Sequence, residues 1–116
     1  MNKVVGARGE KLASEFLQRR GYEILERNFK YDRGEIDLIA KKDDLIVFCE
    51  VKTRRSKTYG GGEEAVDSRK QGQIRKVAEG FISSREPGDF DYRFDVIVVE
   101  QSGKTTKIRL IEDAFH

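Results

Sequence analysis

Three charged side chains interrupt two runs of apolar residues in the segment GEIDLIAKKDDLIVFCEVKTR, residues 34–54. Asp37 lies within the first run, and Glu50 and Lys52 lie within the second. Runs of this kind are typical of a β-hairpin whose strands leave water, and a charge buried there without a partner is costly. These three residues are therefore the first candidates for a chemical function.

The expected strand register brings the three side chains together. If Lys42 pairs with Leu45 across a polar turn, Asp37 falls directly opposite Glu50. Side chains alternate between the faces of a strand, so Glu50 and Lys52 share one face and Asp37 joins them within about 5 Å, Cβ to Cβ. A turn one residue longer would make the carboxylates diagonal neighbours but would leave Glu50 and Lys52 on one face.

Two adjacent carboxylates repel each other, so a fold keeps them together by protonating one or by binding a cation. Carboxylate oxygens suit Mg²⁺ or Mn²⁺, and Mg²⁺ takes only one or two protein carboxylates while water and substrate phosphate complete its shell. Lys52 beside such an ion would orient a water or stabilise charge during attack on phosphorus, which is the chemistry of phosphodiester hydrolysis. The alternative is that Lys52 forms a structural ion pair with Glu50 or Glu35, and the Glu-X-Lys pattern alone leaves both interpretations open.

The composition describes a globular protein with a heavily charged surface. The chain has 116 residues, of which 37% are hydrophobic and 38% charged, and we expect one domain over residues 1–116. Its apolar runs are too short to cross a membrane and its first residues lack the apolar stretch of a signal peptide, so a cytoplasmic location is expected. Cys49 is the only cysteine and His116 the only histidine, which argues against Cys/His metal sites and Ser-His-Asp triads. Strand parity predicts a buried, reduced Cys49 thiol that faces away from Glu50.

Basic residues cluster next to the hairpin. The net charge is only +2, so the whole-chain charge argues weakly for nucleic acid. Arg54, Arg55 and Lys57 follow the second strand, and Lys70 falls on the apolar stripe of a predicted helix. We expect these four residues to meet the phosphates of a nucleic acid, although solvated basic surfaces are common. A charge at Lys70 either extends to the helix edge or points at substrate phosphate, and the second interpretation is favoured.

Hydrophobic periodicity predicts an α/β sandwich with a mixed sheet, in the order α-β-β-β-α-β-β. The predicted elements are a helix over 7–20, a strand over 22–31, a hairpin over 34–53, a helix with apolar positions from Val66 to Ile82, and strands over 92–100 and 106–111. A loop from Ser56 to Gly62 is expected between the hairpin and the second helix, and the segment REPGD ends that helix.

The linked motifs resemble a known group of proteins. Asp37, followed after twelve residues by Glu50-Val51-Lys52, resembles the core of the PD-(D/E)XK nuclease superfamily, which has the restriction-endonuclease-like fold. More closely, GARGEKLASEFLQRRGYEILERNFK, GEIDLIA, FCEVKTR and RFDVIVV resemble the YraN family of small bacterial proteins, which are described as endonucleases by fold and are similar to archaeal Holliday-junction resolvases. The resemblance covers nearly the whole chain.

The resemblance implies roles for individual residues. Asp37 and Glu50 would bind metal, the Val51 carbonyl would assist, and Lys52 would serve the attacking water. Glu10 matches an acidic residue that related resolvases carry on the first helix, where it helps to hold metal or water. From the sequence alone, Glu10 lies in the first turn of the expected helix, where the helix dipole favours a carboxylate without any catalytic role.

Three functions therefore compete. The first is a Mg²⁺-dependent or Mn²⁺-dependent endonuclease that acts on branched or structured DNA, with a homodimer expected by analogy because resolvases cut two strands. The second is a DNA-binding module of the same fold with little or no catalysis. The third is a protein-interaction domain whose hairpin charges are ordinary salt bridges. No membrane partner is expected.

Overall fold

Helices and strands follow one another in the order α-β-β-β-α-β-β, as the sequence predicts. The computed structural model describes residues 3–55, 66–85 and 88–116, with side chains from Arg8 onward, so the predicted loop from Ser56 to Gly62 lies outside the described residues. The elements are α1 (Lys3–Arg19), β1 (Glu23–Tyr31), β2 (Gly34–Lys42), β3 (Leu45–Arg55), α2 (Ser68–Ser83), β4 (Asp91–Ser102) and β5 (Thr105–Phe115).

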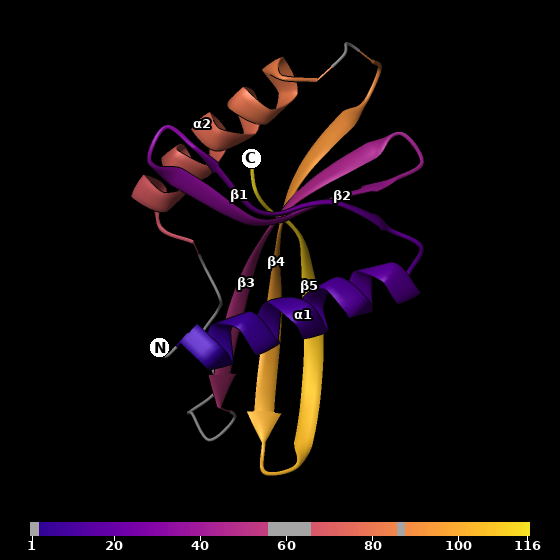
Figure 1. Ribbon diagram of the computed structural model, residues 1–116, viewed down its shortest axis with the longest axis vertical. Helices are drawn as coiled ribbons and strands as arrows, with labels where there is room; N and C mark the ends of the chain where they lie inside the picture. The colour runs from indigo at the N-terminus through magenta and orange to yellow at the C-terminus, as the bar shows by residue number, and fades with distance from the viewer. Residues whose placement is uncertain (1–2, 56–65, 86–87) are drawn as a thin grey trace.

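The strands form one mixed sheet in the spatial order β1-β2-β3-β4-β5, which confirms the predicted α/β class. The β3–β4 pair is parallel, and the other three pairs are antiparallel. Parallel neighbours need a long crossover, and α2 lies in the connection between β3 and β4. Figure 1 shows α1 crossing in front of β3, β4 and β5, while α2 lies near the β1–β2 end of the sheet.

Each face of the sheet packs against one helix, so the central strands are apolar on both sides. On the α2 face, Ile46 and Phe48 of β3 are buried in one cluster with α2. On the α1 face, Val47 and Cys49 are buried in a second cluster with α1. The buried Cys49 thiol confirms the parity argument made from the sequence.

The β2–β3 hairpin has the register that the sequence predicts. Lys42 pairs with Leu45, and the ladder continues to Leu38 opposite Cys49. Asp43 supports the tight turn with a positive φ of 54°. The β2–β3 ladder ends at Leu38 and Cys49, next to Asp37, whereas β3 pairs with β4 as far as Arg55. The end of the ladder therefore lies in the middle of the sheet.

Strand β2 changes faces at Asp37. Ile36 packs in the α2 cluster and Leu38 in the α1 cluster, although residues two apart on a regular strand share a face. Asn28 stands opposite Asp37 in the β1–β2 register and has a positive φ of 51°, a conformation that Asn adopts more readily than most residues. This local break sets the direction of the Asp37 side chain.

Two boundaries differ from the sequence prediction in ways that matter for the site. Helix α1 begins at Lys3, so Glu10 lies in its middle, and the prediction that Glu10 occupies the first turn is wrong. Helix α2 begins after Asp67, whose side chain accepts a hydrogen bond from the Lys70 backbone N–H at 2.9 Å. This N-cap places Lys70 in the first turn of α2.

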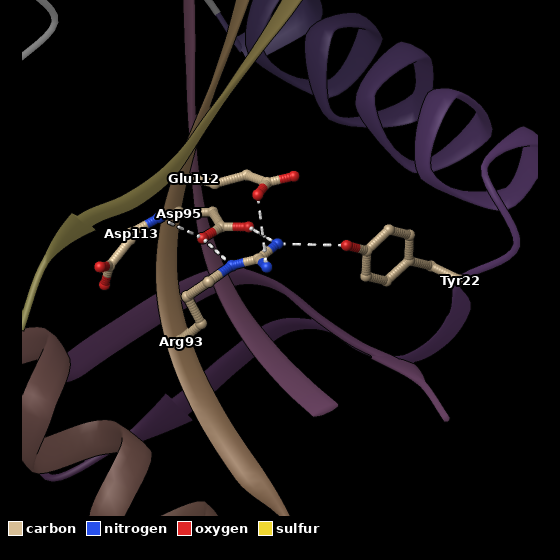
Figure 2. A network of polar contacts seen from close by, with 5 residues as sticks. All are labelled: Tyr22, Arg93, Asp95, Glu112 and Asp113. Carbon is tan, nitrogen blue, oxygen red and sulfur yellow. Dashed lines mark hydrogen bonds and ion pairs between the residues drawn. The ribbon is translucent and has the colours of Figure 1, made fainter. Parts of the chain in front are cut away.

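A polar network stabilises the N-terminal part of β4 (Figure 2). The Asp95 carboxylate is fully buried and accepts two hydrogen bonds from Arg93, both at 2.8 Å. It also accepts the Asp113 backbone N–H at 2.9 Å, where the β4–β5 register shifts. Arg93 reaches Tyr22 Oη at 3.1 Å and the exposed Glu112 at 3.5 Å.

No helix among the described residues is long and apolar enough to cross a membrane.

The Arg93–Asp95 pair gives a test of the fold. Arg93→Met should lower the free energy of unfolding by about 3–5 kcal/mol, because the buried Asp95 carboxylate loses its cation. Glu112→Gln is the control and should change it by less than about 1 kcal/mol, because that carboxylate is 57% exposed. Urea denaturation at pH 7 measures both. Equal losses in the two variants would contradict this account.

Candidate active site

Asp37 terminates the β2–β3 ladder with its side chain. Its Oδ2 accepts a hydrogen bond from the Val51 backbone N–H at 2.8 Å. The last backbone pair of the ladder is Leu38 with Cys49. Beyond that pair, the Asp37 carboxylate rather than a β2 carbonyl accepts the hydrogen bond of the Val51 N–H. The interaction fixes Asp37 against β3, and this carboxyl group also has a second partner.

That second partner is Glu50. The two carboxyl groups share a hydrogen bond, and the pKa of Asp37 rises to about 7. Burial is the largest cause, followed by the hydrogen bond and the negative charge of Glu50, while the Val51 N–H and Lys70 act in the opposite direction. The adjacency of Asp37 and Glu50 inferred from the hairpin register is therefore present. Below about pH 7 and without a metal ion, Asp37 therefore keeps a proton, which offsets the repulsion between the two carboxyl groups.

Lys70 forms an ion pair with the same carboxylate. Its Nζ lies 3.2 Å from Glu50 Oε2, and the Glu50 side chain is 11% exposed while that of Lys70 is 45% exposed. The first turn of α2 thus brings a cation to the end of the ladder from the α2 face. One of the two interpretations left open by the sequence pairs Lys52 with Glu50 or Glu35, whereas the structure shows Lys70 as the ion-pair partner of Glu50.

Lys52 lies on the same face as Glu50, as parity predicts. It pairs in register with Val98 of β4, which belongs to the α2-face cluster. The Lys52 side chain is half-buried, and no described carboxylate forms an ion pair with it. Its ammonium group is therefore available to a ligand on the α2 face.

Glu10 approaches Asp37 from the other side of the sheet. Helix α1 comes close to β3 at Gly9, where a Cβ atom would collide with Thr53 Oγ1. Burial raises the pKa of Glu10, and the charges of Asp37 and Glu35 add to the rise, while a hydrogen bond with Asn28 opposes it. The helix dipole does not explain Glu10, because this residue is far from the first turn.

The donor set fits a hard divalent ion held by two carboxylates. No three His, Cys, Asp or Glu side chains within the described ranges are arranged to hold a metal together, so Glu10 does not complete a three-carboxylate site. Mg²⁺ needs only one or two protein carboxylates, which Asp37 and Glu50 supply. The N–H and C=O of one strand residue point to the same edge, so the Val51 carbonyl also faces the side of β3 where Asp37 lies.

The predicted DNA-binding residues are only partly grouped around this pair. Arg54 forms an ion pair with Glu100 at 3.1 Å, and Arg55 is exposed at the end of β3. Lys57 lies outside the described residues. Sequence reasoning missed Asn28, although a lone Asn within a strand pattern is a usable signal for a positive φ.

Comparisons with known proteins agree over nearly the full length. A family model described as "Uncharacterised protein family UPF0102" matches residues 9–99. A UPF0102 protein of Caldicellulosiruptor bescii is 53% identical over 116 residues, which cover 97% of this chain and 98% of that protein. A UPF0102 protein of Dictyoglomus thermophilum is 46% identical over 116 residues, covering 98% of each. A third, of Geobacter metallireducens, is 46% identical over 114 residues, covering 98% of this chain and 93% of that protein.

The raised pKa of Asp37 gives a test of the carboxylate pair. Without metal, the native state keeps the proton up to about pH 7, whereas the unfolded state releases it near pH 4, so stability should fall as pH rises through this window. Asp37→Asn has no such proton, and its profile should be flatter by up to about 4 kcal/mol between pH 4 and 8. Urea denaturation in EDTA measures both profiles, with Asp44→Asn in the exposed turn as a control that follows wild type. Parallel profiles for wild type and Asp37→Asn would contradict the shared proton.

Proposed function

This chain belongs to the uncharacterised protein family UPF0102, and we propose that it is a metal-dependent endonuclease that hydrolyses phosphodiester bonds in branched or structured DNA. Family membership supports the resemblance to YraN proteins. The wider likeness to PD-(D/E)XK nucleases and to Holliday-junction resolvases rests on the motif of Asp37 with Glu50-Val51-Lys52. On this proposal, residues 1–116 form one nuclease-like domain.

One observation carries the proposal. Asp37 and Glu50 are held so closely that burial and mutual repulsion raise the pKa of Asp37 to about 7. Replacing a shared proton by a divalent cation would relieve the same repulsion, since a cation at this distance favours both ionised carboxylates. A strained pair next to a half-buried lysine is the arrangement expected of a catalytic site rather than of a purely structural one.

Each residue of the site would have a separate role in hydrolysis. Asp37, Glu50 and the Val51 carbonyl would hold Mg²⁺ or Mn²⁺, which when bound neutralises phosphate charge and lowers the pKa of water. Lys52 would donate a hydrogen bond to the attacking water or to the phosphate oxygen on which charge develops. Glu10 would accept a hydrogen bond from water on the α1 side. As water attacks phosphorus, the bond from phosphorus to the leaving oxygen breaks and that oxygen takes up a proton.

DNA is the substrate that the surrounding charges favour. Lys70, Arg54 and Arg55 lie at or near the same end of β3, and Lys57 follows them in the chain. Phosphate contacts of this kind read shape without reading bases, which suits a branched or structured substrate. A homodimer would let two such sites cut two strands.

A DNA-binding module without catalysis is the second candidate, and the Lys70–Glu50 ion pair favours it. An ammonium group at 3.2 Å already balances the charge of Glu50, so the pair can persist without metal. On the nuclease proposal, Lys70 must move from Glu50 toward substrate phosphate when metal binds. The protein-interaction alternative, in which the hairpin charges are ordinary salt bridges, agrees with the Lys70–Glu50 ion pair but leaves Lys52 unexplained, because Lys52 pairs with no described carboxylate.

Metal binding should stabilise the protein. A native-state ligand present at a hundred times its dissociation constant adds about 2.7 kcal/mol, which corresponds to roughly 10 °C in Tm for a chain of this size. Mn²⁺ should therefore raise the Tm of wild type, and Asp37→Asn should abolish the rise. Asp91→Asn, at an exposed position of β4, is the control and should respond like wild type. An identical response of Asp37→Asn would mean that the carboxylate pair is structural.

Catalysis should depend on Lys52. Lys52→Ala should lower single-turnover cleavage of branched DNA in Mg²⁺ by about 10²–10³-fold, because a donor that acts mainly in the transition state is lost. Binding of the same DNA in Ca²⁺ should change little. Lys76→Ala, an exposed lysine of α2 paired with Asp32, should cut like wild type. Wild type that binds junctions, flaps and nicked duplexes without cutting any of them would replace the nuclease by the DNA-binding module.

A further inference from the structure

The strand registers align side chains of β3, β4 and β5 in rows across the α2 face. Residues that are register partners on neighbouring strands share a face. The rows, counted from the carboxylate pair toward the β4–β5 turn, are Glu50–Val96–Ile111, Lys52–Val98–Arg109 and Arg54–Glu100–Lys107. Ile111 packs in the α2-face cluster and Ile108 and Leu110 in the α1-face cluster, which confirms that Arg109 points to the α2 face.

Arg109 lies in the same row as Lys52, with only Val98 between them. Two strand spacings separate these basic residues, or about 10 Å. Val98 is 2% exposed and belongs to the α2-face cluster, so neighbouring side chains cover it. Arg109 is exposed, and no described carboxylate forms an ion pair with it.

The next row, Arg54–Glu100–Lys107, has a lower net charge, but one of its two basic residues forms no ion pair with a described residue. Arg54 is paired with Glu100 at 3.1 Å, so their charges largely cancel. Lys107 stands beside Glu100 on β5 and is exposed, and no ion pair joins it to a described residue. Along β5, Lys107 and Arg109 are therefore about 7 Å apart on one face.

A cleft of about 770 Å³ lies along β5. Val98, Glu100, Lys107 and Arg109 line part of it, and Arg20, Ile108, Leu110 and Glu112 line the rest, so it extends to the α1 side of β5. The two basic residues thus border a hollow rather than a convex surface. Because Val98 is the register partner of Lys52, this hollow adjoins the candidate site.

We propose that Arg109 and Lys107 bind the phosphate backbone of the DNA strand whose scissile phosphate lies at Asp37, Glu50 and Lys52. The inference rests on the proposed function and adds a direction to it, since the strand would cross β4 and β5 rather than contact only the end of β3. Arg is the side chain best suited to phosphate, because its planar guanidinium donates two parallel hydrogen bonds. Lys107, about 7 Å from Arg109 along β5, adds a second positive charge that can contact a neighbouring phosphate.

Charge reversal tests the surface by equilibrium binding. Arg109→Glu and Lys107→Glu should weaken binding of a four-way junction in Ca²⁺, and Arg109→Ala should reduce the slope of log K against log salt by about 1. Lys30→Glu is the matched control, because Lys30 is exposed on β1 at the other edge of the sheet and the change in net charge is the same. If Arg109→Glu binds as tightly as Lys30→Glu with the same slope, the inference is wrong.

Proximity gives an independent measurement. Cys49 is buried, so the thiol introduced by Arg109→Cys can be labelled selectively with a photoreactive azide. That label should crosslink to bound DNA, whereas the same label at Lys30→Cys should not. Both assays run without cleavage, so a wild type that binds but does not cut overturns the nuclease and leaves the DNA contacts of Arg109 and Lys107 standing. Failure of wild type to bind any DNA overturns both, and equal crosslinking from the two positions overturns this inference alone.

Discussion

The early end of the β2–β3 ladder is the constraint on which the candidate site depends. Strand β3 must pair with β2 on one side and continue in parallel with β4 on the other, and the two requirements separate after Leu38 and Cys49. The Val51 N–H is then left without a backbone acceptor, and the Asp37 carboxylate takes it. A backbone group that must be satisfied thus draws a carboxylate to the place where Glu50 already points.

Two aspartates of this fold accept a backbone N–H in the same way, but one lies beside a cation and the other beside a carboxyl group. Asp37 and Asp95 each accept one backbone N–H where a strand pairing is broken. Asp95 is also held by two hydrogen bonds from Arg93, so its charge is compensated within the protein. Asp37 faces the Glu50 carboxylate instead, and its pKa rises to about 7. Lys70 opposes this rise but does not cancel it, so the charge of Asp37 is compensated less fully than that of Asp95. Groups with such perturbed pKa values are common at functional sites.

The sequence predicts much of this arrangement because its strongest signals are local. The Asp43 turn fixes the hairpin register, and strand parity places Glu50 and Lys52 on one face and Cys49 on the other. The contacts it misses depend on distant elements. The partner of Glu50 is Lys70, which an N-cap on another element positions, and Glu10 reaches Asp37 only because α1 packs closely on β3 at Gly9. The position of Arg109 opposite Lys52 requires the registers of two further strand pairs, which no local pattern encodes.

A proton, Lys70 or a divalent ion could compensate the negative charge of the Asp37–Glu50 pair. The three differ in whether they leave positions for water and phosphate. The shared proton removes one charge but occupies the space between the carboxylates, and its loss near pH 7 falls within the physiological range. Lys70 balances Glu50 from the exposed side of α2 and leaves Asp37 facing a second negative group. A divalent ion alone would satisfy both carboxylates and retain positions for water and phosphate. On the proposed function, metal would replace both of these compensations. Lys70, once released from Glu50, would then lie on the α2 face that also carries Lys52 and Arg109.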